Sequence, residues 1–347
     1  MAGPASRRPG TSSPGDRGSN PGRPQATPRP KSAASSPGGT GTKPLWVTAP
    51  NQSYPLALAQ PGRDATMRRL MGAVMVVAML AAYTFVVPIV NGAVLGLGFV
   101  ADKPSVGWDE YVSAASAFHF VWGLAAAHLS LASITLIAWG FYRLWHHRRL
   151  GWLWSVSGTV RWRYGVVCLA VSVLVIGAVT AYYWVSGSGW GAQPGWVWYA
   201  VVIVVTTPFQ ALAEEVMFRG YLMQAFGCIV RQVWFPMICT AVIFALFHGT
   251  QNPWLFASRL VFGILAGLLV WRTGGLEAAV AIHVVNNLCA LGLAVATGSL
   301  VEVRTTTSVD LTQAGSDVAL FAVCAGACWA IAHGMKVPRR TPDVVVD

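Results

Sequence analysis

The sequence predicts an all-α polytopic membrane protein with about eight transmembrane helices and a disordered N-terminal tail. The chain of 347 residues is 54% apolar and only 11% charged, whereas soluble domains carry about 25% charged residues. Its mean hydropathy is +0.53. Eight apolar stretches reach or approach the ~20 residues that a helix needs to cross a bilayer. Water-soluble classes of protein are therefore nearly excluded.

The tail is the first element along the chain. Residues 1–62 contain 12 Pro, 9 Gly and 8 Ser, a composition that cannot bury a core, so residues 1–66 are predicted to be a disordered, basic tail. No apolar segment with a small-residue cleavage site follows Met1, so no signal peptide is predicted and the tail is expected in the cytosol. A solvated linker is the simplest role. The alternative is docking on anionic lipid through the basic residues Arg7, Arg8, Arg63, Arg68 and Arg69.

The predicted spans follow in three groups. Three helices are expected in residues 67–190, four in a core of residues 191–300, and one in residues 301–347, which end in a short cytosolic tail. The fifth and sixth spans are the shortest. The spans are predicted at about 70–96, 118–142, 164–186, 196–226, 233–248, 255–271, 277–297 and 318–335.

The loop charges predict the orientation. The loop at 143–163 holds five arginines and no acid, whereas the loops near 102–110 and 302–317 are each net negative by two. The positive-inside rule then places loop 143–163 in the cytosol, and an even number of spans places both termini there. We expect a multi-pass protein of the plasma membrane.

The basic excess does not indicate nucleic acid as a partner. The chain has 24 Lys and Arg against 13 Asp and Glu. Ten of the basic residues precede position 70, and most others lie between apolar runs, as in the flanks of membrane helices. Membrane lipids and a membrane-associated peptide or protein are the expected partners.

Two adjacent glutamates are the least expected feature of the sequence. Of thirteen carboxylates, only Glu214 and Glu215 lie well inside a predicted span, where a charge costs roughly 2.5–3.5 kcal/mol. Arg219 follows Glu215 by one helical turn, a spacing that favours an ion pair. One arginine cannot neutralise both acids, so the low dielectric favours the protonated form of Glu214, which suits a general base. The simpler interpretation is a structural ion pair beside a neutral spectator.

Two histidines and an asparagine are predicted at a similar depth. Glu214 lies about 18 Å from the predicted turn near residue 226, and His248 lies about 22 Å from the return near residue 233. His283 and Asn287 lie about 10 and 16 Å along the seventh span and share one helix face. Four polar groups from three helices are therefore expected to converge. In contrast, packing roles are expected for the isolated histidines His119, His128 and His333.

The sequence contains three motifs, each in a separate apolar span: EExxxR at 214–219, FxxxH at 244–248 and HxxxN at 283–287. Together they resemble the motifs of the CPBP intramembrane proteases. This family is named for the CAAX prenyl endopeptidases and the bacteriocin-processing or self-immunity proteins, and is also called Abi. The resemblance covers about residues 196–297.

The resemblance implies a set of catalytic roles. It implies that Glu214 is the catalytic glutamate and that His248 helps it to orient and deprotonate a water molecule. It implies that His283 with Asn287 stabilises the oxyanion. The two other charged residues of the motifs, Glu215 and Arg219, would support this arrangement.

The sequence favours no cofactor. Glu214, His248 and His283 could ligate zinc as a His₂Glu set, but no HExxH pair is present and a separate base would be needed. The six cysteines show no CxxC spacing, so no thiolate site is predicted. Glutamate chemistry without a metal is therefore preferred, with zinc as the alternative.

Two other functions remain open at this stage. A catalytically silent binding or immunity protein could keep this fold, although every side chain that the chemistry needs is present. A proton-coupled transporter could also use an intramembrane glutamate and histidine, but it would more often show paired repeats and broken helices. The predicted function is an intramembrane endopeptidase, for which CAAX cleavage is one substrate class among others.

Overall fold

The structure of the protein is a computed structural model that describes residues 47–59, 64–188 and 190–344. Most of the predicted disordered tail lies outside these residues. The described elements are helical apart from two short strands, β1 (Val47–Thr48) and β2 (Leu58–Ala59), which pair antiparallel. The α-helices are α1 (Ala65–Asp102), α2 (Trp108–Ser116), α3 (Val121–Gly140), α4 (Gly151–Trp154), α5 (Trp162–Tyr183), α6 (Trp196–Glu215), α7 (Met223–Ile229), α8 (Trp234–Leu246), α9 (Pro253–Thr273), α10 (Glu277–Thr297), α11 (Leu300–Thr305) and α12 (Leu311–Gly334).

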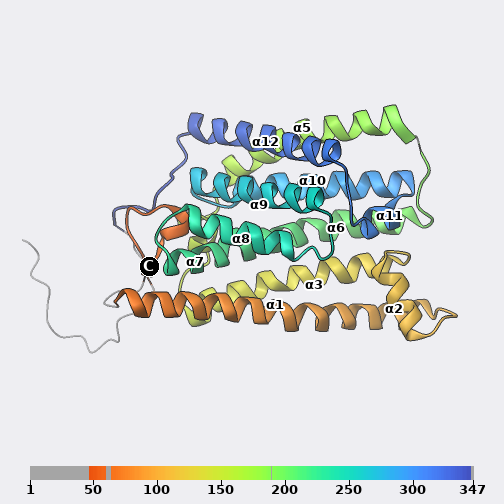
Figure 1. Ribbon diagram of the computed structural model, residues 1–347, viewed down its shortest axis with the longest axis horizontal. Helices are drawn as coiled ribbons and strands as arrows, with labels where there is room; N and C mark the ends of the chain where they lie inside the picture. The colour runs from red at the N-terminus through yellow and green to blue at the C-terminus, as the bar shows by residue number, and fades with distance from the viewer. Residues whose placement is uncertain (1–46, 60–63, 189, 345–347) are drawn as a thin grey trace, which may run out of the picture. The chain divides into compact units, whose positions relative to one another are not determined.

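The long helices confirm an all-α polytopic membrane protein. Within the described residues, seven helices are long and apolar enough to cross a membrane, and each corresponds to a predicted span. Figure 1 shows them side by side along one direction. α6, a π-helical segment (Val216–Leu222) and α7 form one continuous span. The fifth predicted span, 233–248, is the exception, because α8 has 13 residues and extends only about 20 Å.

α8 and α9 form a hairpin whose connecting loop lies inside the length of the bundle (Figure 1). α9 starts with Asn252, whose side chain accepts a hydrogen bond from the backbone N–H of Leu255, and Pro253 follows at the first helical position. Both features are helix-start signals. α9 ends at Gly274, whose φ of 73° is left-handed, as glycine C-caps commonly are. This hairpin places His248 and the start of α9 inside the bundle.

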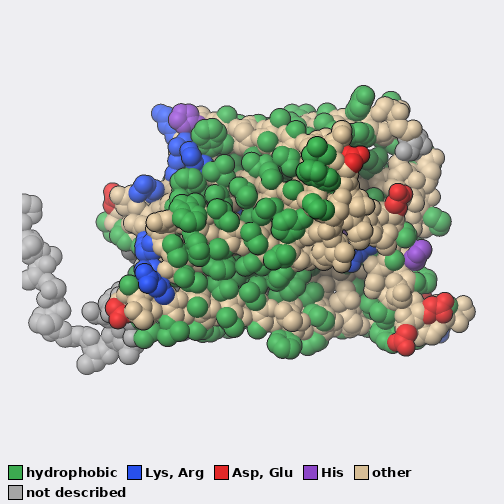
Figure 2. Space-filling model, viewed as in Figure 1, with side chains coloured by type: hydrophobic (Ala, Val, Ile, Leu, Met, Phe, Trp, Pro, Cys, Tyr) green, Lys and Arg blue, Asp and Glu red, His purple; other side chains and the backbone are tan. Residues whose placement is uncertain are grey.

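The described chain ends lie on the same side of the bundle. The backbone N–H of Thr341 donates to the carbonyl oxygen of Gln52 at 2.9 Å, and Ser53 pairs with Arg340 in an isolated bridge. Figure 2 shows hydrophobic side chains over most of the visible face, with basic side chains gathered at this end and acidic ones mainly at the other. This is the charge distribution from which the orientation was predicted.

The basic loop at 143–163 is more deeply packed than a solvated loop. His146 is 1% exposed and its Nε2 lies 2.9 Å from the Tyr221 hydroxyl. Arg148 is 2% exposed and donates to Thr48 Oγ1 at 2.5 Å. Residues 47–59 cover this side of the bundle, which accounts for the burial of Arg148 within the basic loop.

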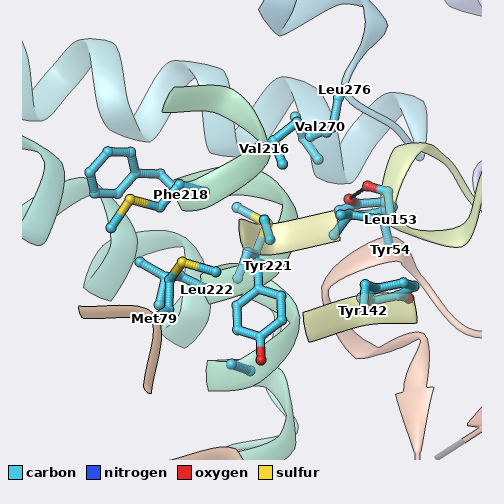
Figure 3. Close-up of a cluster of buried hydrophobic side chains, with 14 of the residues drawn as sticks. Tyr54, Met79, Tyr142, Leu153, Val216, Phe218, Tyr221, Leu222, Val270 and Leu276 are labelled. Atoms are coloured by element: carbon cyan, nitrogen blue, oxygen red, sulfur yellow. Dashed lines mark hydrogen bonds between the residues drawn. The ribbon is translucent and has the colours of Figure 1, made fainter. Parts of the chain in front are cut away.

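The largest apolar core surrounds the π-helical segment (Figure 3). Val216, Phe218 and Leu222 are at most 2% exposed. Tyr54, which precedes the membrane helices in the sequence, inserts into this core and donates its hydroxyl to the Leu153 carbonyl oxygen. The core thus holds the segment that carries the EExxxR motif against α1, α3 and α9.

Candidate active site

The two adjacent glutamates lie where α6 passes into the π-helical segment. α6 ends at Glu215, and the wider π-helical turns begin at Val216. Such turns are rare in helices and are frequent at functional sites. The side chains of Glu215 and Arg219 are fully buried, and Arg219 Nη1 donates to Glu215 Oε1 at 3.0 Å. The ion pair expected from their spacing is present.

The Arg219 guanidinium lies among three phenylalanine rings. Its central carbon is 4.4 Å from the centroid of Phe244, 5.4 Å from that of Phe262 and 5.9 Å from that of Phe218. The negative faces of aromatic rings attract a cation, and more strongly away from water. Because Phe244 belongs to α8 and Phe262 to α9, the buried arginine also connects the π-helical segment to the α8–α9 hairpin.

His283 lies between the two glutamates. Its Nδ1 is 2.8 Å from Glu215 Oε1, and its Nε2 is 3.4 Å from Glu214 Oε2. A neutral imidazole has one N–H, so a neutral His283 that donates from Nδ1 to Glu215 has its Nε2 lone pair on the side of Glu214. His283 therefore lies between the buried ion pair of Glu215 and Arg219 and the cavity-side Glu214.

Glu214 also has a partner that the sequence analysis missed. Gln210 Nε2 donates to Glu214 Oε1 at 2.6 Å, and Gln210 Oε1 accepts from Asn287 Nδ2 at 3.0 Å. The only signal in the sequence was its position, four residues before Glu214 and so on the same helix face. Gln210 fixes one carboxylate oxygen of Glu214 and connects α6 to α10.

His248 lies in the turn that follows α8. Its Nδ1 is 2.8 Å from the Phe244 carbonyl oxygen, so the Nδ1–H donates there and Nε2 is left as an acceptor in the neutral ring. The four-residue spacing of the FxxxH motif produces this contact, because residues i and i+4 are neighbours on a helix. Gly249 follows with a φ of 75°, in the left-handed region, and turns the chain toward α9.

One cavity of about 730 Å³ joins these groups. Glu214, Gln210, His248 and Asn287 line it together with largely apolar side chains of α1 and α3. Glu215, Arg219 and His283 are not among the lining residues, and His283 is 4% exposed. The six predicted residues therefore divide into two groups: three line the cavity (Glu214, His248, Asn287) and three lie behind its wall (Glu215, Arg219, His283).

This division bears on the role that the resemblance implied for His283. Both nitrogens of His283 face carboxylates, so neither is directed at a substrate oxygen. Asn287 donates one amide hydrogen to Gln210 and keeps a second for the cavity. The geometry thus favours Asn287 over His283 as the donor to an oxyanion.

The histidines for which packing roles were expected differ in their surroundings. His128 lines the cavity, and its Nδ1 lies 2.7 Å from Thr206 Oγ1, a contact between α3 and α6. His333 Nδ1 lies 3.0 Å from Arg339 Nη2 near the end of α12. Within the described residues, no group of three or more His, Cys, Asp or Glu side chains is arranged to hold a metal ion.

Comparison with known proteins agrees with the motifs. Residues 194–289 match the family model described as type II CAAX prenyl endopeptidase Rce1-like. A relative from Bacillus subtilis (strain 168), the uncharacterized protein YyaK, is 29% identical over 99 residues, which are 26% of this chain and 33% of the relative. The chain thus spans about a third of that relative's length. No solved structure gives a significant match.

The family match covers the same helices that form the polar site. The matched range contains all three motifs, Gln210 and both residues of the buried ion pair, Glu215 and Arg219. The resemblance that the motifs indicated is therefore confirmed: residues 194–289 match the CPBP/CAAX protease family.

Proposed function

We propose that the protein is an intramembrane endopeptidase that hydrolyses peptide bonds of membrane-associated peptides or proteins with a water molecule activated by Glu214. The observation that carries the proposal is the cavity inside the helix bundle on which Glu214, His248 and Asn287 meet. A peptide hydrolase needs an activated water and a donor to the developing oxyanion in one water-accessible space. These three side chains supply both.

The first step is deprotonation of water. Glu214 in its ionised form accepts a proton from a water that also donates to His248 Nε2, while Gln210 holds the other carboxylate oxygen. The hydroxide oxygen bonds to the substrate carbonyl carbon, and the carbonyl π electrons move to its oxygen. Glu214 then gives the proton to the amide nitrogen as the C–N bond breaks, which yields a carboxylic acid and an amine.

The second requirement is stabilisation of the oxyanion. Asn287 lines the cavity, and the amide hydrogen that it does not donate to Gln210 is the proposed donor. Glu215, Arg219 and His283 are proposed as supporting residues: the buried ion pair holds His283, whose Nε2 faces Glu214. A preorganised donor of this type contributes about 3 to 4 kcal/mol in other hydrolases.

We propose that this chemistry uses no metal ion. The side chains of the alternative zinc set are engaged elsewhere: His283 contacts both glutamates, and His248 Nδ1 is bound to a carbonyl oxygen. Activity of purified protein should therefore survive exhaustive chelation. Loss of activity with a zinc chelator and its recovery with zinc would favour a site made by Glu214, His248 and His283.

The substrate is identified by comparing membranes of cells that express the wild-type protein with membranes of cells that express Glu214→Gln. A peptide or protein whose processing stops in the variant is the substrate, and its mass shows whether it is prenylated. Purified wild-type protein must then cleave it in liposomes. If neither protein changes any membrane peptide, the catalytically silent binding or immunity function becomes the better account.

We propose that both termini face the cytosol of a plasma-membrane protein. The structure supports the same side for both, since residues 52 and 341 pair, and the basic residues gather there. Arg149, in the basic loop at 143–163, is exposed and is therefore a suitable position for a cysteine label. In a background without native cysteines, Arg149→Cys should be shielded from an impermeant thiol reagent in intact cells and Glu302→Cys should be labelled. The reverse pattern would contradict the orientation.

A further inference from the structure

Two arginines outside the three motifs line the same cavity as Glu214. Arg259 belongs to α9 and is partly buried, and Arg304 belongs to α11 and is exposed. Figure 2 shows a small group of basic side-chain atoms set back in the visible face near the position of α11. Arg259 requires an explanation, because a charge on a membrane-spanning helix is rare and is usually paired or functional. Arg304 adds a second cation to the cavity wall from the loop between α10 and α12.

The partners of these arginines are neutral. Arg259 Nη1 donates to Gln251 Oε1 at 2.7 Å. Arg304 Nε donates to the Ser116 carbonyl oxygen at 3.2 Å, and its guanidinium carbon lies 5.1 Å from the Phe118 ring centroid. Within the part of the chain that the structure describes, neither arginine forms an ion pair. A guanidinium has five N–H donors, so most of those on Arg259 and Arg304 are available to a ligand.

The charge of the cavity wall favours an anion. Among the lining residues, Glu214 is the one carboxylate, against the two guanidiniums of Arg259 and Arg304. The wall is therefore net positive even when Glu214 is ionised. Arginine forms bidentate, charge-assisted hydrogen bonds with carboxylates, and these are about twice as strong as neutral ones.

We propose that Arg259 and Arg304 bind a carboxylate of the peptide substrate and so position the chain across Glu214. This inference rests on the proposed function, because it assumes that a peptide occupies the cavity. The carboxylate comes from one of two sources, the C-terminus of the substrate or the side chain of an acidic residue. Both present the same planar anion to the arginine pair, and the experiment separates them.

The test measures binding and does not depend on cleavage. The full chain carrying Glu214→Gln is reconstituted in phosphatidylcholine nanodiscs, and three fluorescent hexapeptides of alternating alanine and leucine are titrated. One has a free C-terminal carboxylate, the second is amidated, and the third is amidated with aspartate as its last residue. We expect the free acid, the aspartate peptide or both to bind at least about tenfold more tightly than the plain amide.

Arginine variants identify the source of this preference. In the same Glu214→Gln background, Arg259→Gln combined with Arg304→Gln should reduce the preference to about one. Arg272→Gln is the matched control, because Arg272 lies on the same helix but is exposed, lies over Trp271 and does not line the cavity. It removes one positive charge and should leave the preference unchanged.

Several results would overturn the proposal. Equal binding of all three peptides would do so, as would a preference that survives the double variant. A third contrary result would be that the Glu214→Gln protein retains phosphatidylglycerol, the double arginine variant does not, and neither protein prefers a peptide with a carboxylate. The arginines would then bind a lipid phosphate. If cleavage by the wild-type protein is never found but the peptide preference is present, the proposed function fails while the carboxylate site stands.

Discussion

The two sides of the polar site use the same residue types in opposite ways. Behind the cavity wall, Glu215 is neutralised by Arg219 and contacted by His283, and all three are buried. On the cavity side, Glu214 accepts a hydrogen bond from the neutral amide of Gln210 and lies 3.4 Å from His283 Nε2. The comparison teaches that adjacent glutamates on one helix can have opposite surroundings: one is neutralised inside the fold, and the other faces the cavity, where the proposed function makes it the base.

The largest expected effect is the loss of cleavage in Glu214→Gln. Glutamine preserves the volume and leaves Glu215 and Arg219 neutral as a pair, so the thermal unfolding midpoint in detergent should stay the same or rise slightly. The base is absent, so cleavage should fall to background. Cleavage by this variant in liposomes at a substantial rate would show that Glu214 is not the base.

The second effect concerns the cavity side alone. Asn287→Ala removes the proposed oxyanion donor and should lower kcat by about a hundredfold or more with little change in KM, since the contact forms mainly in the transition state. Asn286→Ala is the control, because Asn286 contributes a hydrogen bond to Asn287 but is not a lining residue. Equal losses in the two variants would indicate a shared structural role.

The third effect concerns the buried side. Glu215→Gln leaves Arg219 without its counterion in a site with no exposure, and an unpaired buried charge of this kind costs about 3 to 5 kcal/mol. Expression and the unfolding midpoint should fall together with activity. If Glu215→Gln were as stable as Glu214→Gln, the division between a structural and a reactive glutamate would be wrong.

The smallest effect is expected for Gln210, which connects the cavity-side residues. Gln210→Leu removes a hydrogen bond of 2.6 Å to Glu214 and the acceptor of Asn287, so kcat should fall about tenfold while KM and stability change little. As a positioning residue it should also shift the pH profile of kcat, since Glu214 loses a donor. Gln210→Glu, which keeps the acceptor for Asn287, should separate the two contacts. An unchanged pH profile in Gln210→Leu would leave Gln210 a packing role only.

The hydropathy of the chain and the free-energy cost of a charge in the membrane explain why the spans and the polar motif residues could be predicted from the sequence. Seven of the eight spans and all six polar motif residues were found because long apolar runs and buried charges are conspicuous against lipid. The short helix α8 was predicted only as one of the two shortest spans. Its termination at Leu246 depends on the turn at His248 and Gly249, which hydropathy does not detect.

Neutral and tertiary features could not be predicted. Gln210 is an uncharged amide within an apolar run, and nothing but its distance from Glu214 marks it. The burial of His146 and Arg148 depends on residues 47–59, which are about a hundred positions earlier in the chain. The orientation of His283 toward both glutamates depends on how α10 packs against α6, which no periodicity in one helix specifies.

The turn that carries His248 also has a consequence for the order of events during synthesis. The backbone N–H of Asn252 donates to the Thr307 carbonyl oxygen at 2.8 Å, and its side chain donates to the Val309 carbonyl oxygen at 2.7 Å. Irregular backbone at membrane depth is tolerated where protein groups or a water-filled cavity satisfy it. Until the ribosome has added residue 309, these partners do not exist. The turn that carries His248 therefore acquires its full set of hydrogen bonds only after residue 309 has been added, later than every other part of the site.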